Sequence, residues 1–248
     1  MKTLKDIITL TEKRDFIAHI SACNSKTGIP SFNLMAGCGT YDGYRPHVFD
    51  NAPQIAGTCS HNCAGCYAKK MTRYTGVYFN YYENTLLIRR NLPSFKRQMY
   101  AYFTNYNRDV FRIHDSGDFD NFGYFVAWCE IARAFPRVQF YTYTKRTDLL
   151  RKYLKEGRAI PSNLTINLCF WAGVCEDMIE GFPRFEYDDG TRAEVSRLPH
   201  CPAVLEMESA RVSLAHSVSG APMLKRAICG RFTRINPNRP APLGCGVR

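Results

Sequence analysis

The pattern of apolar and polar positions alternates between strand-like and helix-like periods in the middle of the chain. Residues 110–114, 138–143 and 164–170 are short, rich in β-branched and aromatic side chains, and predict strands. Residues 122–135 and 147–156 carry apolar side chains at helical spacing and predict helices between those strands. Strands separated by helices of this length join through right-handed crossovers into a parallel sheet. We therefore expect an α/β fold.

The flanking segments are less regular. Residues 3–20 have near-helical apolar spacing and predict an opening helix, whereas residues 23–46 are rich in turn formers and predict an irregular segment. Residues 53–57 predict a short strand, and a hairpin is expected over residues 182–195. Further elements are expected as helices at 67–74, 83–90 and 94–106, the last capped by Ser94, and as a short strand at 212–216.

Three cysteines, Cys59, Cys63 and Cys66, have C-x3-C-x2-C spacing on a short loop after the predicted 53–57 strand. This spacing lets three thiolates converge on one face of an iron–sulfur cluster. Three ligands on a four-iron cluster leave one iron with an open position, as in catalytic metal sites that keep a position for a ligand. A structural zinc loop completed by His61 or by a distant cysteine is the alternative.

Polar side chains follow the predicted strands at their carboxyl ends, where α/β sheets bind ligands. The first strand leads into Ser116 and Asp118, the second into Lys145 and Arg146, and the third contributes an amide and an aromatic ring. A carboxylate, two cations and an amide together suit a ligand that has both an amine and a carboxylate. The alternative for Asp118 is a helix cap.

Eleven cysteines, without a recognisable secretion signal, argue for metal ligands and buried thiols over a disulfide framework. We expect Cys129 and Cys169 to be core thiols, and Cys23 and Cys38 to be buried thiols as well. Near the end of the chain the cysteines are dispersed. A second metal site there would use His200, Cys201, Cys229 and Cys245.

A formal charge of +11 on 248 residues favours a polyanionic partner such as nucleic acid or a nucleotide, with ordinary solubility as the alternative. Residues 219–248 contain basic side chains and no Asp or Glu. No apolar run reaches the roughly 18 residues of a membrane span, and the first residues lack the apolar core of a signal peptide. We expect a cytoplasmic protein without a membrane partner.

With its cysteine loop followed by alternating helices and strands, the chain resembles the radical S-adenosylmethionine superfamily, whose signature matches Cys59, Cys63 and Cys66. A group of phage and mobile-element proteins of unassigned substrate is similar over about residues 22–170. That second likeness is carried by Asn24-Ser25-Lys26, Cys66-Tyr67-Ala68, residues 112–118 and Tyr143-Thr144-Lys145-Arg146. Gly65 departs from the superfamily pattern, because many members have an aromatic residue there.

The resemblance implies a partial (βα)6-type parallel barrel over residues 53–217, after an N-terminal helix and irregular extension at 1–52 and before a basic tail at 218–248. It implies that the open iron binds the amine and carboxylate of S-adenosylmethionine, which a reduced [4Fe–4S] cluster cleaves to a 5′-deoxyadenosyl radical. An electron donor such as flavodoxin or ferredoxin is then required. The cofactor-binding residues that this resemblance implies are Ser116, Gly117, Asp118, Lys145, Arg146 and Asn167.

The sequence therefore predicts a radical S-adenosylmethionine enzyme acting on a nucleic-acid or nucleotide substrate, with no residue assigned to the catalytic step itself. A non-catalytic zinc or iron–sulfur protein that binds nucleic acid through its basic tail is the alternative from another class. A cluster that serves only in electron transfer is the third, although that role does not need an open iron.

Overall fold

The computed structural model of the 248-residue chain describes residues 16–22, 28–39, 55–61, 63, 66–171, 179, 184–188, 192–195 and 232–234. Several sequence predictions lie outside these ranges. They are the strand at 212–216, the thiol of Cys23 and the second metal site at His200, Cys201, Cys229 and Cys245. Of the helix expected over residues 3–20, only residues 16–20 are described, and His19 and Ile20 belong to a strand instead.

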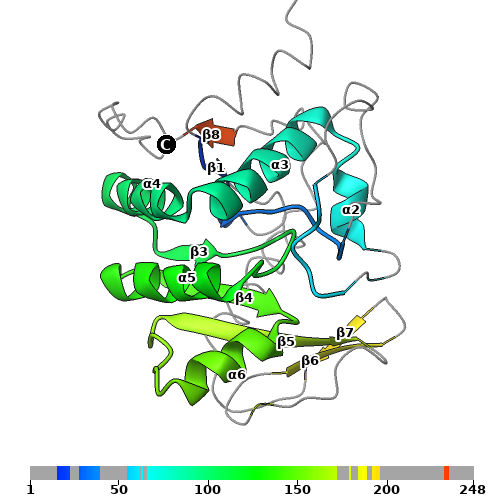
Figure 1. Ribbon diagram of the computed structural model, residues 1–248, viewed down its shortest axis with the longest axis vertical. Helices are drawn as coiled ribbons and strands as arrows, with labels where there is room; N and C mark the ends of the chain where they lie inside the picture. Colours follow the sequence, from blue (N-terminus) through cyan, green and yellow to red (C-terminus); the bar gives the residue numbers. More distant parts are fainter. Residues whose placement is uncertain are drawn as a thin grey trace, which may run out of the picture.

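One sheet forms the centre of the molecule, with the strand order β7-β6-β5-β4-β3-β2-β1-β8 (Figure 1). Its parallel part consists of β2 (Ser31–Phe32), β3 (Val110–Arg112), β4 (Gln139–Thr144), β5 (Leu164–Trp171) and β6 (Arg184–Asp188). Antiparallel strands are added at the two edges, namely β1 (His19–Ser21) and β8 (Phe232–Arg234) at one and β7 (Arg192–Val195) at the other.

This sheet confirms the predicted α/β class and the parallel pairing of the strands at 110–114, 138–143 and 164–170. The predicted hairpin is also confirmed, because β6 and β7 pair with Asp188 opposite Arg192. A barrel is not shown: β7 and β8 lie at opposite ends of the strand order in the described sheet.

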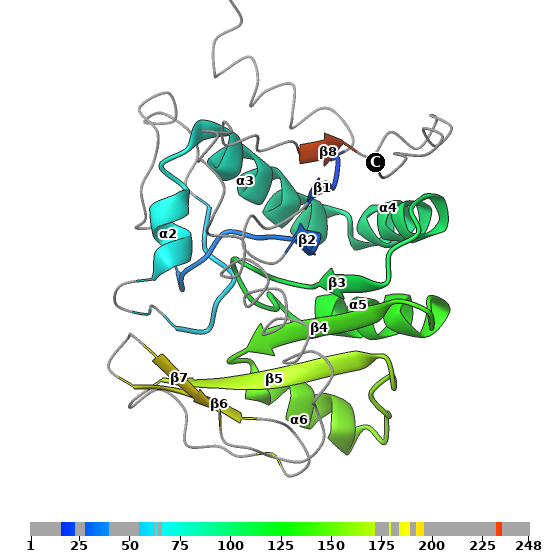
Figure 2. The same cartoon turned by 180° about the vertical axis from the view of Figure 1, so that it is seen from behind.

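Helices α3 (Thr75–Arg90), α4 (Leu92–Asn105), α5 (Phe122–Ala134) and α6 (Thr147–Lys155) follow one another in contact beside the sheet. The short helix α2 (Tyr67–Met71) lies apart from them, where Tyr67 contacts the chain that follows β3. Helix α3 contacts α4, α4 contacts α5, and α5 contacts α6. Figures 1 and 2 show α4, α5 and α6 on one face of the sheet, with β3, β4 and β5 nearer the viewer in Figure 2.

The core lies between this helix layer and the sheet. Alternate side chains of a strand point to opposite faces, and Phe111, Phe140 and Leu164 are aligned across three neighbouring strands and buried. They belong to one cluster with Phe103 of α4 and Trp128 of α5. The opposite face carries a different set of aligned residues, including Arg112 beside Tyr141, and Tyr143 beside Asn167.

Three local predictions need correction, and one alternative is excluded. Helix α3 begins at Thr75 instead of residue 83. The side chain of Asn91, not Ser94, caps α4 by accepting a 3.0 Å hydrogen bond from Ser94 N. Of the strand predicted at 53–57, only residues 55–57 are described, and among them Ala56 alone forms an isolated bridge. The first parallel strand is β2, inside the segment predicted to be irregular. Asn121 caps α5, so Asp118 is not its cap.

None of the helices in the described ranges combines the length and apolar composition needed to cross a membrane.

Candidate functional site

The segment that leads into the cysteine loop is fixed by backbone hydrogen bonds to the loop after β2. Thr58 N donates to Met35 O at 2.9 Å, and Cys59 N donates to Gly37 O at 3.0 Å. The two backbones approach so closely that a Cβ on Gly57 would lie 2.0 Å from Gly37 O. Cys59 is therefore held at a defined place, and Gly57 is required for that approach.

The chain that follows β3 is joined to the same loop. Asn33 Oδ1 accepts hydrogen bonds from Asp115 N at 2.6 Å and Ser116 N at 3.2 Å. The Ser116 hydroxyl donates to Leu34 O at 2.9 Å. Gly117 has φ +81°, and a Cβ there would lie 2.7 Å from Leu34 Cβ. Ser116 and Gly117, both predicted site residues, thus shape the backbone at this end of the sheet.

Asp118 is a buried carboxylate at the meeting point of three segments. It accepts hydrogen bonds from Thr144 Oγ1 at 2.6 Å, Lys145 N at 2.9 Å and Phe119 N at 2.8 Å. Its own backbone N–H donates to Thr58 Oγ1 at 3.0 Å. Burial raises the pKa of Asp118, and the three hydrogen bonds act in the opposite direction. Asp118 therefore ties β4 to the cysteine segment.

Arg89, near the end of α3, fastens the same region from outside. Its guanidinium donates to Ala56 O at 2.8 Å and Gly57 O at 3.1 Å, and it forms an ion pair with Asp120. One side chain thus connects the start of the cysteine segment to the chain after β3. The sequence pattern did not identify Arg89, because no local pattern marks a contact between such distant segments.

Lys145 faces sulfur atoms and a carboxylate at the carboxyl end of β4. Burial lowers the pKa of Lys145, but the charges of Cys169, Cys63, Asp118 and Cys59 raise it by more, so the net shift is upward. The ammonium group is therefore within electrostatic range of two of the three loop cysteines. Cys169, on β5, also reaches this place and was not predicted to do so.

The three loop thiols are half-buried. Burial and then the charge of Asp118 raise the pKa of Cys59 to about 12, and Cys66 contributes as well, so these two thiols interact. Cys66 directly precedes α2, and its side chain makes no capping hydrogen bond to that helix. The thiol group of Cys66 is thus not used to cap α2.

The arrangement of the thiols bears on metal ligation. In the described ranges, no group of three His, Cys, Asp or Glu side chains is already drawn together closely enough to hold a metal ion. The chemistry of the donors nevertheless fits, because three thiols on one short loop are the ligands that iron–sulfur clusters and structural zinc prefer. Ligation would require the three thiols to close on the metal.

The remaining predicted residues are engaged with protein groups. The Arg146 guanidinium donates to Phe119 O at 2.6 Å and to Asp120 O at 3.0 Å, and it pairs with Asp148 at 2.8 Å. Asn167 is buried and donates from Nδ2 to Thr142 O at 3.1 Å. Arg146 therefore holds the chain after β3, whereas the charges that raise the pKa of Lys145 include those of loop cysteines.

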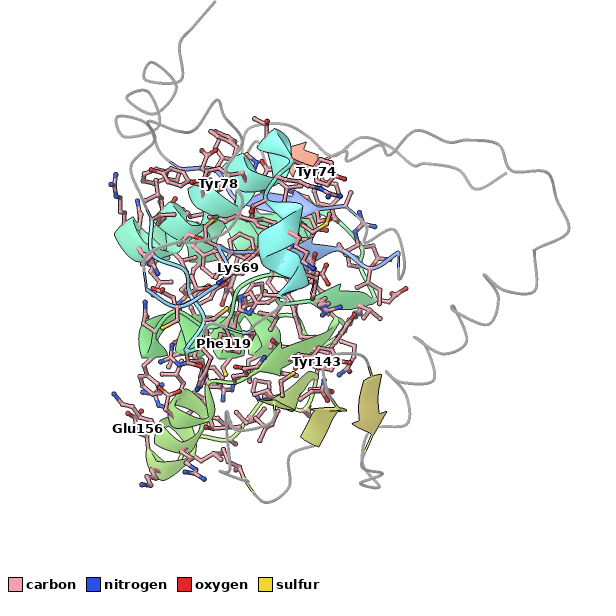
Figure 3. The ribbon with its side chains drawn as sticks, turned by 90° about the vertical axis from the view of Figure 1, so that its right-hand side faces the viewer. Lys69, Tyr74, Tyr78, Phe119, Tyr143 and Glu156 are labelled. Carbon is pink, nitrogen blue, oxygen red and sulfur yellow. The ribbon has the colours of Figure 1, made fainter. Side chains whose placement is uncertain are left out.

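The sheet face opposite the helices adds a cluster that was not predicted from the sequence. Arg112 forms a 2.8 Å ion pair with Asp115, and its guanidinium carbon lies 5.2 Å from the ring centre of Tyr143. The hydroxyl of Tyr67, the first residue of α2, donates to the backbone carbonyl of Asp115. In Figure 3, α2 lies in front of the sheet, with Tyr143 labelled below it. An arginine inside a strand, beside tyrosines at alternate positions, was the available sequence signal.

Of the other described cysteines, two have the burial predicted from the sequence and one does not. Cys129 and Cys169 are buried, as expected, although Cys169 also faces Lys145. Cys38 is exposed, so its prediction as a buried thiol is wrong. It lies in the loop after β2, beside Gly37 and Gly39, which both have positive φ.

Comparison with protein families matches residues 22–180 to the family described as Gene product 88, a phage-type family. No curated protein matches the chain, and no solved structure matches it. The match is not to a radical S-adenosylmethionine family, so the recognition of the chain as a member of that superfamily is wrong. The matched segment covers more than half of the sequence, and the chain belongs to the Gene product 88 family.

Proposed function

We propose that the protein is an enzyme that binds a [4Fe–4S] cluster through Cys59, Cys63 and Cys66 and uses it together with S-adenosylmethionine. One observation carries this proposal: the cysteine segment is joined to the carboxyl end of a parallel strand, because Asp118 N donates to Thr58 Oγ1 while the Asp118 carboxylate accepts from Thr144 Oγ1 and Lys145 N. Ligand sites of α/β sheets lie at this edge. The proposal concerns the chemistry of the site and does not depend on membership of a larger superfamily.

The chain supplies three thiolate ligands and leaves one iron of a four-iron cluster for the cofactor. A cluster held by Cys59, Cys63 and Cys66 would supply, when reduced, the one electron needed for reductive cleavage of S-adenosylmethionine into methionine and a 5′-deoxyadenosyl fragment. The protein's own task is to bind and orient the cofactor and to exclude water. An external one-electron donor, such as a flavodoxin or a ferredoxin, completes the system.

Lys145 is the group that binds the cofactor carboxylate in this proposal. Lys145 is half-buried, and the charges of Cys63 and Cys59 are among those that raise its pKa. The side chains of Ser116 and Asp118 are used to fix the chain after β3. The backbone of residues 116–118 would therefore be the part that contacts the cofactor amine. Asn167 is placed on the next strand, opposite Tyr143 in the register.

We also propose that the sheet forms a partial βα barrel. From β2 to β6 each strand is paired with the next strand in the sequence, as in a βα barrel. The side chains on the face opposite the helices, such as Arg112 and Tyr143, would then line the inside of the curved sheet.

A second candidate function keeps the same ligands without catalysis. The loop thiols are not yet gathered into a ligand group in the described conformation, and a single zinc ion is a smaller centre than a four-iron cluster. A zinc or iron–sulfur protein that only binds nucleic acid would contain the metal but would not cleave S-adenosylmethionine.

The test is to purify the full chain without oxygen, to measure iron, sulfide and zinc, and then to supply dithionite and S-adenosylmethionine. We expect about four iron and four sulfide per chain, and formation of 5′-deoxyadenosine. Cys63→Ala should lose iron, whereas Cys129→Ser, a control in the core, should keep it. Stoichiometric zinc without iron would overturn the cluster, and an iron-loaded protein that forms no 5′-deoxyadenosine would overturn the activity.

A further inference from the structure

Helix α2 and the turn that follows it present large apolar side chains to solvent. Tyr67, Met71 and Tyr74 are 60%, 40% and 45% exposed, and they are three of the four exposed large hydrophobic residues in the described ranges. Tyr67 and Met71 are four positions apart and share one side of α2. Exposed apolar groups that lie together mark interaction sites more often than isolated ones do.

The charge of this segment has one sign. Between Cys59 and Tyr82 the sequence contains Lys69, Lys70 and Arg73 and no Asp or Glu. Lys70 and Arg73 are exposed. Figure 3 shows α2 at the front of the molecule, with Lys69 and Tyr74 labelled beside it. A polyanion is the partner that this charge attracts.

The aromatic and basic groups are also arranged together. The Arg73 guanidinium carbon lies 4.8 Å from the centre of the Tyr74 ring, and Arg73 Nη2 donates to the Tyr74 hydroxyl at 2.8 Å. A ring paired with a planar cation offers a flat surface for a base and a charge for the adjoining phosphate.

We propose that the surface formed by Tyr67, Lys70, Met71, Arg73 and Tyr74, which we call the α2 surface, binds single-stranded nucleic acid. The ring of Tyr74 stacks on a base, while Lys70 and Arg73 contact phosphates. A single strand is favoured over a duplex because its bases are available for stacking. An acidic protein would satisfy the cations but would leave the exposed rings without a flat partner.

This inference deepens the proposed function by naming its substrate class, and it rests on that function only for the claim that the bound strand is the substrate. Tyr67 directly follows Cys66, and its hydroxyl contacts the chain after β3. A strand on the α2 surface therefore lies next to the cysteine loop. Binding itself needs neither S-adenosylmethionine nor a reductant.

The experiment measures the binding of a labelled single-stranded oligonucleotide of about 12 nucleotides to the full chain by fluorescence anisotropy, at several salt concentrations and without S-adenosylmethionine. Lys70→Gln/Arg73→Gln should bind at least about tenfold more weakly, and the salt slope should decrease by about 1.4 because two phosphate contacts are lost. The matched control, Lys152→Gln/Lys155→Gln, removes two exposed cations from α6 and should change the affinity less than about twofold.

A second pair tests stacking. Tyr74→Ser should weaken binding by about fivefold or more, whereas Tyr100→Ser, at an exposed tyrosine of α4, should not. Thermal unfolding of all four variants checks that they are folded. Absence of binding, or equal effects of test and control variants, would overturn the proposal. A loss in Lys70→Gln/Arg73→Gln without a loss in Tyr74→Ser would show that the strand is bound by charge alone, without stacking, and would also overturn the proposal.

The two proposals fail separately. Oligonucleotide binding that requires the α2 surface, in a protein that forms no 5′-deoxyadenosine, would overturn the enzymatic function and leave the surface established. Formation of 5′-deoxyadenosine without oligonucleotide binding would support the enzymatic function and overturn the nucleic-acid surface.

Discussion

The Thr144 hydroxyl donates a 2.6 Å hydrogen bond to Asp118 Oδ1, and this bond joins the carboxyl end of β4 to the chain that follows β3. Both side chains are buried. Asp118 also accepts from the backbone N–H of Lys145, so the same carboxylate fixes the residue that faces the cysteines. The position of Lys145 therefore depends on Asp118 and Thr144.

Thr144→Val should lower the free energy of unfolding by about 2 kcal/mol, because it removes a hydrogen bond to a buried carboxylate. Thr142→Val is the matched control on the same strand. Thr142 is also buried, and its hydroxyl has no hydrogen-bond partner in the described part of the chain, so this variant should be neutral or slightly stabilising. Urea unfolding measures both. Equal losses in the two variants would contradict the stabilising role of the Thr144–Asp118 bond.

Gly57→Ala should displace the cysteine segment, since its Cβ would lie 2.0 Å from the carbonyl oxygen of Gly37. We expect a lower melting temperature and reduced binding of iron. Gly76→Ala is the control, because a Cβ at this position in α3 meets nothing within 4 Å. It should leave the melting temperature and the iron content close to those of the unsubstituted protein. A Gly57→Ala protein with the native melting temperature and iron content would show that the close approach is not required.

Lys145→Gln and Arg146→Gln should have different effects, although the two residues are adjacent. Lys145→Gln should keep its iron and need about tenfold more S-adenosylmethionine for half-maximal formation of 5′-deoxyadenosine, because a charged contact to the carboxylate is lost. Arg146→Gln should instead lower the free energy of unfolding by about 1–2 kcal/mol, because it loses contacts to Phe119 O and Asp120 O. Steady-state kinetics and urea unfolding separate these effects, and the opposite assignment would refute the separate roles of Lys145 and Arg146.

The stability of the protein should fall as the pH decreases below 6.5. Burial, followed by the charge of Arg112, lowers the pKa of His114 from 6.5 to about 3 in the folded protein. Between these values the unfolded chain binds a proton that the folded chain does not, so acid favours unfolding. His114→Gln should remove this part of the pH dependence, while the contributions of other groups stay common to both proteins. Urea unfolding at several pH values tests this, and identical pH profiles would contradict it.

The sequence predicted the part of the fold that has strong periodicity. Between Val110 and Trp171, alternating strands and helices matched the structure because each element has a continuous apolar face. Strands β1 and β2 were missed because they contain only three and two residues. Their positions depend on distant side chains such as Asn84, which bonds to both His19 N and His19 O. No local pattern encodes such contacts.

The predicted site was recovered where strand topology alone brings residues together. Asp118 and Lys145 meet because parallel strands end at the same edge of the sheet. Arg89 and Cys169 were not predicted to belong to the site. The position of Arg89 in the sequence indicated only a basic residue at the end of a helix, and that of Cys169 indicated only a buried strand residue.

The most direct test of the cysteine site is electron paramagnetic resonance of the reduced, iron-loaded protein before and after S-adenosylmethionine is added. The proposed open iron predicts that the spectrum of the reduced cluster changes when the cofactor binds. This change should persist in Cys169→Ser, and the cluster signal should be lost in Cys63→Ala. A spectrum that S-adenosylmethionine leaves unchanged, or a cluster that is lost with Cys169 and retained without Cys63, would contradict a three-cysteine cluster with an open iron.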